Sequence, residues 1–432
     1  MEEVDVQVKD NPPSIERILR PIMYTSWFLG VGIAHPRKCP KAVKIIIRII
    51  HIAVCSYIMI GDIKFSGPSS DINKRFKSLL RYIYYLNKMM CYVSRYYYIY
   101  YGIRQYNKWT ELMDRLKGLD QKIRKEIPMN DRSIKVMEAL AVFMTFIFCP
   151  LWPTIQILYY YIISYTINEK VIIDMLFNYI LAQSLINSFV FDVVVYVLYR
   201  RFQTINKLIG QLEKLSDIQC IAFKIRRIRE LHADVCDLAS MVNDIHSLHL
   251  FFCSGNCFTR ATSSLFYFVD PTKRANWLNW ISEFLYIVYS MQFCLICWIC
   301  TLACEESNKT GRIIHKIILN CQPRNLDNHE ANSSSLGMQP SLEDLEGEQN
   351  CDCCSSRSPY VVENFLRRNL DLECVTNEVN NFSIQLLQNR IAFTAYDFFE
   401  INLVSYGWFV GLIITYVMLG YNEKISDTCV CK

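Results

Sequence analysis

The last apolar stretch of the chain carries polar residues whose spacing places them on one side of a helix. Its polar face, as we call it from here on, consists of Trp408, Gly411, Thr415, Met418 and Asn422. Glu423 directly follows the amide of Asn422. A glycine, a hydroxyl and an amide on one helix face either line water or pack tightly against another membrane helix. The residues by themselves favour neither interpretation.

Long apolar blocks elsewhere in the sequence can supply the helices that position this face. Of the 432 residues, 52% are hydrophobic and 13% are aromatic. Each block is about as long as a bilayer-spanning helix, which is roughly 20 residues. We therefore expect an all-α, polytopic membrane protein with seven transmembrane helices. The blocks are residues 42–61, 79–102, 136–165, 171–199, 247–269, 277–303 and 396–421.

Basic residues gather before the first block and in the connections after the second and fourth blocks. Because basic residues are enriched on the cytosolic side, we expect a cytosolic N-terminus and an extracellular C-terminus. Residues 1–41 then form a cytosolic N-terminal segment, residues 42–303 hold the first six spans, and residues 304–395 form a cytosolic loop. The seventh helix, 396–421, leads into a short extracellular tail, 422–432.

The cytosolic connections are expected to be partly helical. An apolar stripe that includes Leu231 and Val235 runs through the segment of about 200–246, so the fourth and fifth membrane helices should continue into the cytosol. Residues 321–358 are strongly polar and predict a disordered insertion. Helical spacing returns at 361–390, which predicts an amphipathic anchor helix before the last span.

Charged and aromatic residues interrupt the second block. Arg81, Lys88 and Arg95 follow one another at intervals of seven and share a helix face, which we expect to line protein or water rather than lipid. Tyrosines at the outer ends of the second and third spans fit either a pocket wall for a small, largely apolar ligand or an interfacial belt. They are Tyr82, Tyr84, Tyr85, Tyr159, Tyr160 and Tyr161.

Several motifs resemble those of the insect gustatory receptors, within the seven-transmembrane insect chemoreceptor superfamily. The signature of that family is Thr-Tyr, five mostly hydrophobic residues and then Gln-Phe in the last helix. Here Thr415-Tyr416 and five such residues are followed by Asn422-Glu423, which departs from the Gln-Phe pair. FTAYDFFEINL (393–403) looks like the lead-in to that helix. RFQTIN (201–206) and LHADVCDLASMVN (231–243) look like the linker between the fourth and fifth helices.

The resemblance implies a ligand-gated, nonselective cation channel in the plasma membrane of chemosensory neurons. Four subunits, identical or mixed with related receptors, would surround one pore with their last helices in the lipid bilayer. A small-molecule tastant would bind in the outer half of each subunit. Bitter or other non-sugar compounds are favoured, because Val417 stands where sugar receptors of the family tend to carry Glu. The resemblance places the constriction at Asn422 and Glu423. The other candidate pore or gate residues are Thr415 on the polar face and the bulky apolar Met418 and Leu419, which could close a pore by excluding water.

Glu423 would add a specific property to such a tetramer. Four carboxylates at the outer mouth would attract the permeating cations and repel anions. They would also raise one another's pKa, so that the channel would respond to external pH. The alternative is that Glu423 is a solvated residue at the helix end and points away from the pore axis.

Other functional classes find little support in the sequence. It contains no glycine-rich phosphate loop, zinc-protease motif or nucleophile elbow, so we expect neither an enzyme nor a cofactor, and a net charge of +5 does not suggest nucleic acid. Four cysteines from Cys294 to Cys304 share a helix face and favour close packing over metal binding. The role of the CDCC cluster, 351–354, stays open. The alternative function is a seven-helix G-protein-coupled chemosensory receptor, although the charge bias opposes its extracellular N-terminus.

Overall fold

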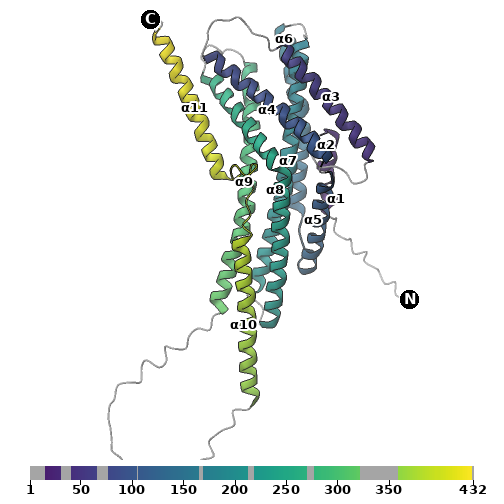
Figure 1. Cartoon of the computed structure of the whole chain (residues 1–432), viewed down its shortest axis with the longest axis vertical. Coiled ribbons are helices and arrows are strands. Elements are labelled where there is room, and N and C mark those ends of the chain that lie inside the picture. The colour runs from purple at the N-terminus through teal and green to yellow at the C-terminus, as the bar shows by residue number, and fades with distance from the viewer. Residues whose placement is uncertain are drawn as a thin grey trace, which may run out of the picture. The chain divides into compact units, whose positions relative to one another are not determined.

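The computed structural model describes residues 15–30, 40–65, 76–104, 106–164, 169–212, 218–269, 277–321 and 359–430. Nearly all of these residues are helical (Figure 1). The helices are α1 (Ile15–Ile18), α2 (Arg20–Phe28), α3 (Lys41–Phe65), α4 (Phe76–Arg104), α5 (Tyr106–Glu126), α6 (Arg132–Ser164), α7 (Glu169–Leu212), α8 (Ile218–Val269), α9 (Trp277–Cys321), α10 (Pro359–Gln388) and α11 (Leu403–Val430). The expectation of an all-α chain is confirmed.

The long helices follow the apolar blocks, and three of them run well past the block ends. Helices α7, α8 and α9 are 44, 52 and 45 residues long, because amphipathic sequence continues the helical pattern beyond the apolar part. Helix α10 lies where the anchor helix was expected. The expected insertion, apart from residue 321, lies outside the described residues, as does the 351–354 cluster.

Helix α5 was not among the expected elements. Its sequence is strongly charged, but Trp109, Leu112, Leu116 and Ile123 recur at helical spacing and are all buried. One apolar stripe of this kind is enough to hold a helix against its neighbours when the opposite face is solvated.

The last helix begins later and ends later than expected. It starts at Leu403 rather than at residue 396, and it continues through Asn422 and Glu423 to Val430. The residues before it form a small turn instead, in which Tyr396 and Asp397 have left-handed backbone angles (φ of 50° and 59°). A helix cannot pass through two such residues.

Membrane-spanning character is uneven among the described residues. By length and composition, Ile45–Lys64 within α3 qualifies as a candidate span, and Leu403–Leu419 is a shorter apolar helical stretch. Other blocks carry more ionisable groups or contain side chains outside the described set. The seven spans and their orientation therefore stay predictions.

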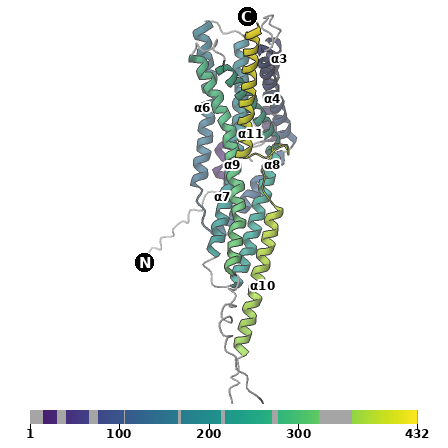
Figure 2. The same ribbon diagram turned by 90° about the vertical axis from the view of Figure 1, so that its left-hand side faces the viewer.

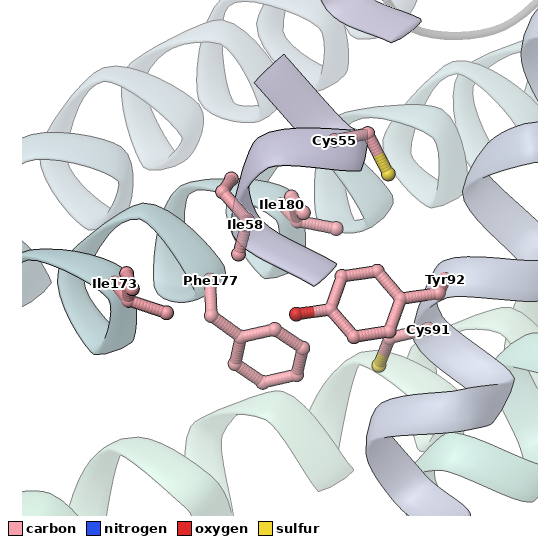
Figure 3. Packing of buried hydrophobic residues seen from close by; sticks show 7 residues of the cluster. All are labelled: Cys55, Ile58, Cys91, Tyr92, Ile173, Phe177 and Ile180. Carbon is pink, nitrogen blue, oxygen red and sulfur yellow. The ribbon is translucent and has the colours of Figure 1, made fainter. Parts of the chain in front are cut away.

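The chain divides into two compact units. One comprises residues 1–204, 234–307 and 391–432, and the other comprises residues 205–233 and 308–390. In the first unit, a cluster of apolar residues joins α3, α4 and α7. Figure 3 shows the Tyr92 ring of α4 with its hydroxyl directed toward Ile58 and Phe177, and the Tyr92 and Phe177 ring centroids are 5.7 Å apart.

The second unit packs the end of α7, the start of α8, the end of α9 and α10 around an apolar core. Val375, Val379 and Phe382 of α10 are buried at spacings of four and three, as in a helix that packs along one stripe. Phe382 contacts His232 edge to face, with ring centroids 5.6 Å apart. The Thr310 hydroxyl donates a 2.6 Å hydrogen bond to the Asn206 side chain.

A buried ion network ties α5, α7 and the start of α6 together in the first unit. The Arg201 guanidinium binds both oxygens of Asp120, at 2.7 and 3.0 Å, and one oxygen of Asp131 at 3.2 Å. Arg124 binds the second oxygen of Asp131. Burial raises the pKa of the Asp120 carboxyl, and the neighbouring Arg201 charge offsets part of that rise. Removing one partner would therefore leave an uncompensated buried charge.

Replacing Arg201 with Ala should destabilise the first unit by about 3–5 kcal/mol, because Asp120 and Asp131 would remain buried without their shared cation. Thermal unfolding of the purified protein in detergent measures this as a lower Tm. Arg115→Ala is the matched control, since the Arg115–Glu111 pair on α5 is exposed and should contribute less than about 1 kcal/mol. Equal effects of the two substitutions would show that the buried network is not a special source of stability.

Candidate functional site

The start of α11 is fixed by side chains on both sides of its first turn. The Asn402 side chain accepts a 2.8 Å hydrogen bond from the Ser405 backbone N–H, which makes it the N-cap. The Leu403 N–H, which has no partner within the helix, donates to the Thr301 hydroxyl of α9 at 2.9 Å. The Ser405 hydroxyl donates to the Glu400 carbonyl at 2.6 Å. The helix therefore has a defined origin.

Beyond this origin, α11 contacts the described part of its unit mainly through aromatic side chains. Phe409 lies against Phe293 of α9 and Phe258 of α8, with ring centroids 5.0 and 5.8 Å apart. In both Figure 1 and Figure 2, the ribbon of α11 starts beside that of α9. Among the side chains of α11 that the structure describes, Ile413 is the most buried. Tyr416 touches Phe258 one turn further on. The packed side of α11 is a narrow stripe.

The polar face lies on the exposed side of α11. Trp408 is 74% exposed and Met418 is 60% exposed, and Gly411 and Thr415 between them are exposed as well. The Thr415 hydroxyl donates its hydrogen to the Gly411 carbonyl at 2.9 Å, so its oxygen lone pairs are what the face presents. Leu419 is also exposed. Asn422 and Glu423 continue the helix, and their side chains lie outside the described set.

The linker before α11, residues 391–402, is held to α8 by a paired amide contact. The Asn243 side chain accepts a hydrogen bond from the Thr394 N–H at 2.7 Å and donates one to the Thr394 hydroxyl at 3.2 Å. The linker closes on itself through a 2.7 Å bond from the Ile401 N–H to the Phe393 carbonyl. Phe393 and Ile401 are buried. The linker is thus a packed element and not a loose connection.

A chain of buried contacts runs from this linker back to α4. Phe393 packs edge to face on Phe191 of α7, and Phe191 packs on His246 of α8. His246 lies beside His249, whose Nδ1 is hydrogen-bonded to the Tyr98 hydroxyl of α4. We call the set Phe393, Phe191, His246, His249 and Tyr98 the relay. It connects the lead-in of the last helix to the interior of the bundle.

Tyr98, at the far end of the relay, borders a small buried void of about 10 Å³. The void is polar on one side, because Ser94 and Arg95 of α4 and Asn256 of α8 line it. Arg95 is buried, in line with the expectation that its helix face avoids lipid. The lining residues are Cys91, Ser94, Arg95, Tyr98, Ile180, Ser184 and Asn256.

A buried ion pair lies one to two turns along α4 from this void. The Lys88 ammonium is 2.5 Å from an oxygen of Asp62 on α3, and the Tyr92 hydroxyl donates to the other oxygen. The Lys88 ammonium also lies 5.0 Å from the Phe177 ring centroid. Asn87 donates a 2.8 Å hydrogen bond to Thr259 of α8. A polar seam therefore crosses the otherwise apolar core between α3, α4 and α8.

The tyrosines expected at the outer ends of the spans are only partly described. Tyr82 and Tyr161 are 70% and 63% exposed, and Tyr85 is half-buried. The side chains of Tyr84, Tyr159 and Tyr160 lie outside the described set, so the pocket that these residues would form stays a prediction.

Tyr92 and Tyr98, which make the buried polar contacts, were not among the tyrosines expected to form the ligand pocket. The signal was present, because they lie four residues after Lys88 and three after Arg95 and so share the charged face. Among the described residues, no group of three or more His, Cys, Asp or Glu side chains could hold a metal ion.

Comparisons with known proteins bear on the family and on the fold. Residues 19–334 match a family model described as 7tm Chemosensory receptor. The structure of the insect olfactory receptor OR5 from Machilis hrabei in complex with eugenol is similar, with a TM-score of 0.60 and 12% identity over 95% of this chain and 97% of that chain. The structure of the same receptor described without eugenol gives a TM-score of 0.52 and 13% identity over 94% and 96%. A search of curated protein sequences finds no match. At these identities, the likeness to the solved structures concerns the fold.

Replacing Asn243 with Ala should loosen the linker, because both hydrogen bonds to Thr394 are lost. Hydrogen–deuterium exchange of peptides covering 391–402 should then speed up by roughly tenfold, as expected from two lost hydrogen bonds. Asn243→Asp is the matched control, since it keeps the acceptor for the Thr394 N–H and should give an intermediate rate. Unchanged exchange in Asn243→Ala would mean that the buried Phe393 and Ile401 hold the linker by themselves.

Proposed function

The chain belongs to the 7tm chemosensory receptor family, and on this premise we propose that it is a gustatory receptor that works as a ligand-gated, nonselective cation channel. The family is one of membrane-embedded receptors and not of enzymes, which confirms the expectation that this chain is not an enzyme. The expected membership of the insect chemoreceptor superfamily is also confirmed. The gustatory role, the kind of tastant and the channel activity of this chain are the proposal.

The observation that carries the proposal is the exposed polar face of α11. A membrane helix that touches its own unit along one narrow stripe needs other neighbours. Gly411 and Thr415 on its open side suit water or another helix better than lipid. Four copies of the chain arranged around one axis would turn this face toward a shared path. Thr415 would then line the path, and Met418 and Leu419 would be the apolar rings that close it by excluding water.

Asn422 and Glu423 would lie at the outer mouth of such a pore. They stand in the helix one turn beyond Met418 and Leu419, since α11 continues to Val430. This continuity supports placing them on the same path as Thr415, with four carboxylates that concentrate cations.

The ligand would bind among α4, α7 and α8. The void beside Tyr98 has polar groups on one side and apolar ones on the other, which suits a small organic molecule with few polar groups once the side chains around it move apart. The relay offers a physical route from that place to the linker of α11. One similar structure is described as a complex with eugenol, a molecule of this general kind. Val417 favours a non-sugar ligand, and Tyr82, Tyr85 and Tyr161 would form the outer entrance.

The G-protein-coupled alternative finds no support in the comparisons. The family model is that of chemosensory receptors, and the similar structures are those of an insect olfactory receptor. A homotetramer, or a heteromer with related receptors, remains the assembly that we propose.

Expression of the chain in a cell without other receptors, with calcium imaging across classes of small organic compounds, should identify an activating compound. Thr415→Cys channels opened by that compound should be blocked by a water-soluble thiol reagent, because Thr415 lines the path. Ile413→Cys is the matched control, since Ile413 is buried on the packed stripe and should show only the block seen with the unmodified chain. Equal sensitivity of the two variants would contradict a pore lined by the polar face.

Replacing Glu423 with Gln should lower the calcium-to-sodium permeability ratio by roughly twofold or more, because a ring of carboxylates would be lost from the mouth. Reversal potentials in bi-ionic solutions measure the ratio. The response to external pH should flatten in the same variant, since Gln carries no titratable group. Glu305→Gln on α9 removes the same charge from an exposed site elsewhere and should change neither property. Unaltered selectivity and pH response in Glu423→Gln would place the side chain away from the path.

A further inference from the structure

A second and much larger cavity, of about 430 Å³, lies between α8, α9, the linker and α11. We call it the aromatic cavity. It is distinct from the void beside Tyr98, with which it shares no lining residue. The lining residues are Phe251, Ser254, Gly255, Phe258, Phe293, Phe399, Ser405, Trp408, Phe409 and Leu412.

The walls of the aromatic cavity suit an uncharged, largely apolar guest. No charged side chain is among the described lining residues, so a charged molecule would lose its hydration without gaining a partner. Phe409 contacts both Phe258 and Phe293, so the three rings form part of one aromatic wall. Binding pockets for small molecules have a volume of this order and a similar aromatic lining.

The polar side chains of the lining restrict further which functional groups a guest molecule can carry. The Ser254 hydroxyl donates its one hydrogen to the Phe251 carbonyl at 2.8 Å, and the Ser405 hydroxyl donates its own to the Glu400 carbonyl at 2.6 Å. Each oxygen is left with lone pairs that accept a hydrogen bond but has no hydrogen left to donate. A hydroxyl on the guest suits these acceptors, because it can donate its hydrogen to either serine oxygen.

We propose that the aromatic cavity is a binding site for a small phenol or aromatic alcohol, separate from the site beside Tyr98. Because α11 forms one wall, an occupant stabilises the arrangement of α8, α9 and α11 in which the cavity is present. Binding itself does not depend on the proposed function. The consequence for channel opening does rest on it.

Photolabelling of the purified full-length protein in lipid nanodiscs, with an alkyl phenol that carries a diazirine group, tests the site directly. Peptide mapping should place the label on residues 251–258 of α8 and 405–412 of α11. Leu412→Trp fills the cavity and should reduce this labelling by at least about tenfold. Ser254→Ala keeps the volume, removes one acceptor and should weaken competition by the unlabelled phenol about fivefold.

The matched control is Ile414→Trp, which adds the same side chain at an exposed position of α11 that does not line the cavity and should leave labelling unchanged. Label found only elsewhere, or labelling equal in Leu412→Trp and Ile414→Trp, would overturn the proposal. So would displacement of the label by added phospholipid but not by the unlabelled phenol, since a lipid chain would then be the occupant. If no compound opens the channel, the labelling result still stands, so the two failures are distinguishable.

Discussion

The attachment of α11 to its unit is the constraint on which the functional arrangement depends. Its first turn is fixed by directional hydrogen bonds, from Ser405 to the Asn402 cap and from Leu403 to Thr301. Further along, it is held by aromatic contacts such as Phe409 with Phe293. Hydrogen bonds set a position, whereas stacked or tilted rings keep much of their energy when they slide by a fraction of their width. A helix held in this way has a fixed first turn, whereas a change in the direction of its axis costs less energy.

The linker shows how the first turn of α11 can be held in place and still respond to a change in neighbouring contacts. Tyr396 and Asp397 adopt left-handed backbone angles, which cost energy for residues with side chains. They persist because Asn243 binds Thr394 on one side and because Phe393 and Ile401 are buried. A strained turn that is held by a few specific contacts responds when one of those contacts shifts. The packing of Phe393 against Phe191 places the relay in direct contact with it.

The sequence predicted the helices where burial follows a regular period and missed features that depend on tertiary contacts. Apolar blocks located the long helices, and the intervals between Lys88 and Arg95 identified a buried face. The start of α11 was missed because the aromatic residues of the linker, such as Phe398 and Phe399, look like helix core in a hydropathy pattern. Their role is visible only once the turn at Tyr396 brings Phe393 next to Phe191. Helix α5 was missed because its charges outweighed its apolar stripe in composition.

One short segment of α8 borders both the void beside Tyr98 and the aromatic cavity. Asn256 lines the void beside Tyr98, whereas Ser254 and Phe258 line the aromatic cavity. Gly255 between them allows close contact with α4, since a Cβ there would come within 2.2 Å of the Met90 methyl group. A helix that packs this closely on one neighbour transmits a displacement instead of absorbing it, because the interior has little free volume. A change around Asn256 therefore moves the wall against which Phe409 and α11 rest.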